Sequence, residues 1–103
     1  MGDPRCRDEA NGHADTLREA IGFLDQALTY EPDNEQLLEE RRLAIDYVTG
    51  AGAFAQEEWE IAIARWGPIY AIRRDYQRGA LEAALKEACS KSFEPDEELC
   101  PPP

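Results

Sequence analysis

The sequence predicts an all-α protein of about four helices that form antiparallel hairpins. Apolar residues recur at steps of three and four along four segments, as they do in helices that bury one face. Two of these segments share a pattern: an Ala-Ile pair, at Ala20 and again at Ala62, opens an apolar stripe that ends at a turn containing aspartate. A unit that recurs in this way is typical of helical hairpins stacked on copies of themselves.

The first helix is expected near residues 16–30. Thr16 and Glu19 have the spacing of a capping box, which would start the helix at Thr16, and Pro32 would end it. Its stripe places Ile21, Leu24 and Leu28 on one flank.

The second helix is expected near residues 35–55. Asp33 and Asn34 precede Glu35 and Gln36 in a second capping pattern, which would open this helix. Two glycines, Gly50 and Gly52, interrupt its stripe, so the helix either breaks there or continues with glycine at a close helix contact. We expect it to continue, because the apolar spacing keeps its phase through both glycines.

The third and fourth helices are expected near residues 58–73 and 76–90. In the third, four large apolar residues follow each other at steps of 4, 3 and 4, and we expect them to pack in the core: Trp59, Ile63, Trp66 and Tyr70. Asp75 would cap the fourth helix. The sequence thus divides into a flexible lead-in over 1–15, a helical domain over 16–91 and an acidic, proline-ended tail over 92–103.

The composition indicates a soluble protein whose negative charge disfavours binding to polyanions. Lys and Arg number 11 while Asp and Glu number 22, which gives a net charge of −11. Such a surface repels nucleic-acid phosphates and anionic lipids, so we expect neither nucleic acid nor membrane as a partner. The acidity either serves solubility alone or favours a protein or peptide partner with basic flanks.

The three cysteines, Cys6, Cys89 and Cys100, lack the spacing of metal ligands, and His13 is the only histidine. We expect three free thiols in a reducing cytoplasm. The alternative is an extracytoplasmic protein in which Cys89 and Cys100 pair. With no nucleophile and base in a catalytic arrangement and no phosphate-binding glycine loop, we expect no enzyme, no catalytic residue, no metal and no cofactor.

The repeated pattern resembles the tetratricopeptide repeat. Ala20-Ile21, Ala27-Leu28 and the turn Pro32-Asp33-Asn34 match the second half of one such repeat, and Gly50, Ala62-Ile63 and Asp75 match parts of the next. Ala20 and Ala62 are 42 residues apart, whereas the family's period is about 34. The resemblance implies a right-handed stack of hairpins, with Ala20 and Ala62 at close helix contacts.

The resemblance also implies a non-catalytic protein-binding or scaffolding module. In this family the partner lies on the concave face, and the matching residues form an apolar strip here: Tyr47, Ala51, Phe54, Arg78, Leu81 and Leu85. The plainer interpretation of Tyr47 and Phe54 is packing against neighbouring helices. The alternative function is a self-associating helical domain, because the flank at Ile21, Leu24 and Leu28 lacks the helix that precedes it in a repeat. Residues 1–14, a second copy in a homodimer or the rest of a larger protein would have to cover that flank.

Overall fold

The computed structural model describes residues 4–102 and the side chains of residues 8–102. Residues 4–102 form four α-helices and one short 3-10 helix: α1 (Pro4–Tyr30), α2 (Glu35–Ala55), α3 (Trp59–Ile72), η1 (Tyr76–Gly79) and α4 (Ala80–Lys91). No strand occurs within residues 4–102. The all-α class and the expected number of α-helices are therefore confirmed.

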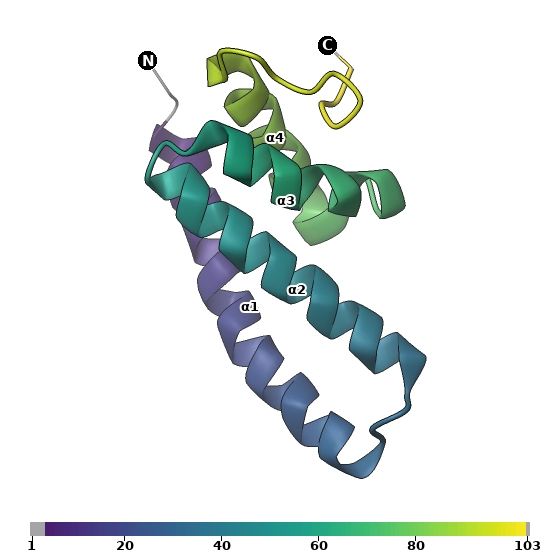
Figure 1. Ribbon diagram of the computed structural model, residues 1–103. Helices are drawn as coiled ribbons and strands as arrows, with labels where there is room; N and C mark the ends of the chain where they lie inside the picture. Colours follow the sequence, from purple (N-terminus) through teal and green to yellow (C-terminus); the bar gives the residue numbers. More distant parts are fainter. Residues whose placement is uncertain (1–3, 103) are drawn as a thin grey trace.

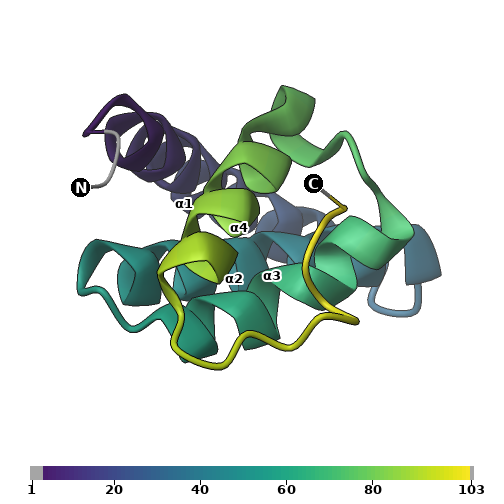
Figure 2. The ribbon, with the colours of Figure 1, turned by 90° about the horizontal axis from the view of Figure 1, so that it is seen from above.

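The helices α1 and α2 form a long antiparallel hairpin, and α3 and α4 pack against only one end of it (Figure 1). The turn between α1 and α2 projects beyond α3 and α4, which makes the molecule 45 Å long but only about half as wide. Seen from above, α4 lies beside both α1 and α3, while the tail over 92–102 follows the outer side of α3 (Figure 2). The hydrophobic core occupies the end where all four helices meet.

The helix α1 begins far earlier than expected, at Pro4. Ala10, Ala14 and Leu17 recur at helical spacing and are buried in the core, so residues 4–15 are three turns of a packed helix rather than a flexible lead-in. Thr16 does not cap a helix, since its hydroxyl donates to the Gly12 carbonyl inside α1. Residues 1–3 of the expected lead-in lie outside the described part.

The helix α2 has the bounds that the sequence predicts. The Asn34 side chain accepts hydrogen bonds from the amides of Gln36 and Leu37, as an N-cap residue does. The helix continues through both glycines. A Cβ at Gly50 would lie 2.3 Å from Nε1 of Trp66, whereas a Cβ at Gly52 would meet nothing within 4 Å. The close-contact interpretation therefore holds at Gly50 alone.

Trp66 of α3 fills the space above Gly50 and is fully buried. Its indole Nε1 donates to the Tyr47 carbonyl at 3.0 Å. The indole ring lies between Tyr47 and Phe54, with ring centroids 5.7 and 5.2 Å away. Ile63 and Tyr70 of the same stripe are buried too, and Trp59 packs at the core's edge, so this stripe belongs to the core as expected.

The tail over 92–102 folds back along α3, while its acidic residues Glu94, Asp96, Glu97 and Glu98 stay exposed. Cys89 and Cys100 form a disulfide, which corrects the expectation of free thiols at these two positions. Leu99 packs where Gly67 leaves space on α3, because a Cβ at Gly67 would lie 2.6 Å from the Leu99 Cβ. The side chain of Cys6 lies outside the described residues.

We predict that Gly50→Ala destabilises the protein by about 1–3 kcal/mol, because the new methyl group overlaps a buried indole. Gly52→Ala is the matched control in the same helix, where nothing opposes a methyl group. That variant should be neutral or gain up to about 1 kcal/mol from helix propensity. Urea denaturation measures both, and equal stability of the two variants would contradict the contact between Gly50 and Trp66.

We predict that reduction of the Cys89–Cys100 bond lowers the free energy of unfolding by up to about 3 kcal/mol, the loop-closure value for a loop of this size. Urea denaturation with and without a dithiol measures the loss. The double variant Cys89→Ser/Cys100→Ser should match the reduced protein and be insensitive to the dithiol. A wild-type midpoint that does not change on reduction would contradict the pairing.

Candidate functional site

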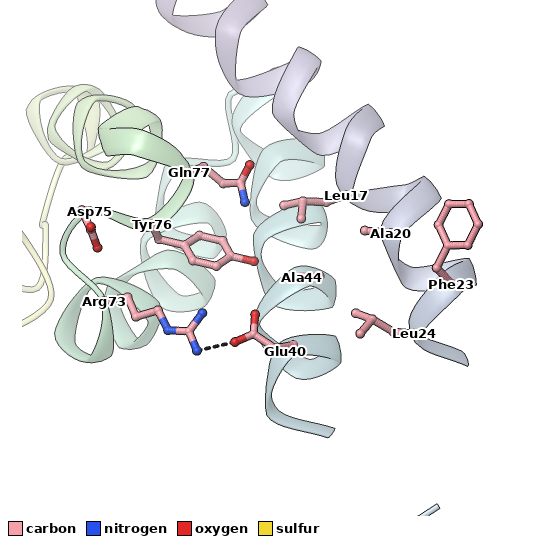
Figure 3. Close-up of a pocket in the computed structure, with 10 residues that line it drawn as sticks. All are labelled: Leu17, Ala20, Phe23, Leu24, Glu40, Ala44, Arg73, Asp75, Tyr76 and Gln77. Atoms are coloured by element: carbon pink, nitrogen blue, oxygen red, sulfur yellow. Dashed lines mark hydrogen bonds and ion pairs between the residues drawn. The ribbon is translucent and has the colours of Figure 1, made fainter. Parts of the chain in front are cut away.

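A groove of about 650 Å³ opens where the hairpin leaves the core, and we call it the hairpin groove (Figure 3). Its first wall is α1, its base is α2, and its second wall is the turn that follows α3. Its lining is Leu17, Ala20, Phe23, Leu24, Glu40, Ala44, Arg73, Asp75, Tyr76 and Gln77. The helices that build the core at one end of the hairpin thus leave an apolar recess beside it.

The α1 wall is apolar and only partly covered. Leu17, Ala20 and Leu24 share one face of the helix and are directed toward α2 (Figure 3). Leu17 is buried, but Ala20 and Leu24 are half-buried and Phe23 is 71% exposed. Exposure therefore increases along α1 as the helix leaves the core.

An ion pair joins the base of the groove to its second wall. Glu40 of α2 accepts a hydrogen bond from the guanidinium of Arg73, which follows the last residue of α3 (Figure 3). The bond to Glu40 raises the pKa of Arg73 above its ordinary value. Both side chains are only about one-third exposed. The pair neutralises its own two charges and leaves Asp75 as the charged lining residue without an ion pair to a described residue.

The second wall contains a buried tyrosine and an unusual backbone. Tyr76 is 6% exposed, and its ring centroid lies 5.8 Å from that of Tyr47. Burial, followed by the nearby carboxylate of Glu40, raises the pKa of Tyr76 to about 12. The next residues, Gln77 and Arg78, have left-handed φ values of 54° and 57°, which are costly for residues with a side chain.

A hydrogen bond from α1 holds this wall in place. His13 Nδ1 donates to the Gln77 side-chain oxygen over 2.8 Å, so the turn is tied to the helix opposite it. His13 was expected in a flexible segment. Its partner Gln77 is 64 residues away along the sequence. Spacing along the chain gives no signal for such a contact.

The predicted apolar strip is not an exposed surface. Tyr47, Ala51, Phe54, Leu81 and Leu85 are each at most 1% exposed, because α2 and α4 bury these side chains in the common core. Arg78 is exposed and lies in the turn before α4. The plainer interpretation, packing against neighbouring helices, therefore describes Tyr47 and Phe54.

The flank that the sequence left uncovered does contribute to the hairpin groove. Leu24 lines it, and Ile21 and Leu28 beside it are half-buried. Residues 4–14 do not fold back over this flank, since they continue α1 in the opposite direction (Figure 1). The other lining residues were missed as a group, because a groove between three segments has no periodic signature in any one of them.

The lining offers apolar contact and one neutralised ion pair, with no pairing of a nucleophile and a base among its residues. Within the described residues, no three His, Cys, Asp or Glu side chains gather as a metal site would require. No helix over residues 4–102 combines the length and apolar character that crossing a membrane requires.

No protein-family model matches this chain, and no curated protein or solved structure is significantly similar to it. The resemblance to the tetratricopeptide repeat therefore rests on the sequence pattern alone and stays a prediction.

We predict that the protein loses stability between pH 10 and pH 12 as Tyr76 ionises. The folded state holds the neutral phenol up to about pH 12, whereas the unfolded chain releases the proton near pH 10. The higher pKa of Tyr76 in the folded state therefore contributes about 2–3 kcal/mol to the free energy of unfolding below pH 10. This contribution is lost as the pH rises from about 10 to about 12. Urea denaturation of wild type and Tyr76→Phe at pH 9 and 11.5 isolates this group from the other tyrosines. Parallel losses in both proteins would contradict it.

Proposed function

We propose that this protein is a non-catalytic protein-binding module whose hairpin groove receives an amphipathic helix of a partner protein. The observation that supports the proposal is an apolar recess on the projecting half of the hairpin, bordered by a phenylalanine that is 71% exposed. Exposed apolar surface beside a recess is typical of a site for another protein.

A helix fits the dimensions of the recess. Leu17, Ala20 and Leu24 span two turns of α1, or about 10 Å. At the core end of the hairpin, α3 and α4 pack on α1 and α2, whereas neither of them reaches the end of the hairpin that carries the α1–α2 turn (Figure 1). A partner helix would occupy the next packing position along the hairpin, with its apolar side chains inserted between α1 and the 73–77 turn.

The open shape of the groove favours a helix over a small molecule. Its volume of about 650 Å³ lies within the range of small-molecule pockets, but such pockets enclose most of their ligand. This groove is open along one side, which would leave much of a small ligand in water. A helix needs only one of its faces covered.

The sequence resemblance agrees with this occupant. In a tetratricopeptide repeat the helix that carries the Ala-Ile pair is the second of two, and the helix before it covers its flank. Here α1 carries Ala20-Ile21, and a partner helix in the groove would cover the exposed part of that flank. The protein would then act as a scaffold that completes a hairpin with a foreign segment.

We predict that amphipathic helical peptides, selected for binding from a displayed library, lose about tenfold or more in affinity when Phe23 is replaced by serine. An exposed aromatic side chain that a partner covers is typical of the residues that carry much of the binding energy. Phe93→Ser is the matched control: Phe93 is 92% exposed and lies in the tail, away from the lining of the groove. Fluorescence anisotropy measures the affinities.

Two results would remove the hairpin groove from consideration as this kind of site. One is a library without helical binders, and the other is equal affinity for the Phe23→Ser and Phe93→Ser proteins. Light scattering should give the monomer mass of 11.6 kDa. A mass of twice that value, reduced to monomer by Phe23→Ser, would assign the groove to a second copy and support the self-associating alternative.

A further inference from the structure

We propose that the helix bound in the hairpin groove is basic, with Lys or Arg on both sides of its apolar stripe. This inference rests on the proposed function and adds the chemistry of the partner. The charges on the two sides of the groove, rather than the net charge of the chain alone, lead to it.

The hairpin carries more carboxylates than it neutralises. Residues 15–42 contain eight Asp and Glu but only three Arg. Each of these arginines pairs within the hairpin: Arg18 with Asp15, Arg41 with Asp25 and Arg42 with Glu39. Glu40 pairs with Arg73. Four carboxylates then have no ion pair with a described residue: Glu19, Glu31, Asp33 and Glu35.

Two unpaired carboxylates lie on opposite sides of the hairpin groove. Glu19 is exposed on α1, directly before the lining residue Ala20. Asp75 is exposed on the opposite wall and forms no ion pair with a residue of the described chain. A helix that inserts its apolar face would have Asp75 at one edge, and at the other edge α1, which carries Glu19 outside the lining. Cationic side chains at the flanks of that helix would be attracted by both carboxylates.

Of the nearby arginines, only Arg73 lines the groove, and it is paired with Glu40. Arg74, whose guanidinium lies 5.7 Å from the centroid of the Tyr70 ring, and Arg78 are exposed but are not among the residues that line the groove. The charge left within the lining is therefore the carboxylate of Asp75.

The same charges disfavour a second copy as the occupant. Each chain carries −11, and two hairpins docked groove to groove would bring like charges together. A basic helix from another protein would instead be attracted, because its charge is opposite to that of the hairpin. This attraction acts over the screening length of the solution.

The test uses two peptides of about 18 residues, or five helical turns. Both carry the same Leu and Ala face, and one has Lys and the other Glu on its polar face. At about 0.1 M salt the Lys peptide should bind the full chain at least about tenfold more tightly. At about 1 M salt, where the screening length falls to about 3 Å, most of this difference should disappear.

The role of the two edges is tested by charge-matched variants. Glu19→Gln/Asp75→Asn should weaken binding of the Lys peptide about threefold to tenfold, as expected for two exposed ion pairs. Glu97→Gln/Glu98→Gln removes the same charge from the exposed tail and should change affinity by less than about twofold. Equal weakening by both variants would show that net charge alone acts, and would overturn the inference.

Failure of this inference is distinguishable from failure of the proposed function. If both peptides bind with equal affinity and Phe23→Ser weakens both, the groove binds helices without regard to charge, and the inference alone is overturned. If the Lys peptide binds equally well to Phe23→Ser, it adheres to the acidic surface outside the groove, which also overturns the inference. If neither peptide binds and the displayed library yields no helix, the proposed function falls as well.

Discussion

The contact between Trp66 and Gly50 determines how the rest of the molecule is arranged. Because residue 50 has no side chain, the indole approaches the α2 backbone closely enough for Nε1 to donate to the Tyr47 carbonyl. Tyr47 in turn contacts Tyr76 in the following turn, and its hydroxyl donates to the Ala10 carbonyl of α1. One close approach thus connects α3 to α2, and through Tyr47 connects both to η1 and α1.

The position of the hairpin groove follows from this arrangement. The large aromatic side chains Tyr47, Phe54 and Trp66 all lie at one end of the hairpin, so α3 and α4 gather there. The other half of the hairpin carries smaller apolar residues and many carboxylates, and nothing else in the described chain buries it. The groove forms at the boundary, where Tyr76 is still buried but Phe23 is not. The large buried side chains are concentrated at one end, and the half-buried apolar flank of α1 is left at the other.

The sequence predicted the elements better than it predicted their surroundings. The bounds of α2 and the close contact at Gly50 could be predicted because Asn34 and a continuous apolar phase are local signals. The first turns of α1 could not, because Ala10 and Ala14 are small and stand among polar residues. The acidic residues of the tail are exposed, as its composition indicates, but its path back along α3 was missed, because that path depends on the Cys89–Cys100 bond and has no periodic signal. Periodicity also placed Leu81 and Leu85 on the apolar face of a helix, but it does not indicate which part of the chain covers that face. Ala62 is fully buried and Ala20 only half-buried, so equivalent places in the repeated pattern have different neighbours.

We propose that the protein holds a helix in the hairpin groove, and not on the buried strip around Tyr47 and Phe54 or on its tail. Backbone amide chemical shifts of the isotopically labelled chain, recorded while an amphipathic helical peptide is titrated in, test this proposal residue by residue. We expect the largest changes in 17–24, 40–44 and 73–77, with little change over 92–102. Changes concentrated in the tail, or spread evenly through the core around Phe54 and Leu81, would contradict it.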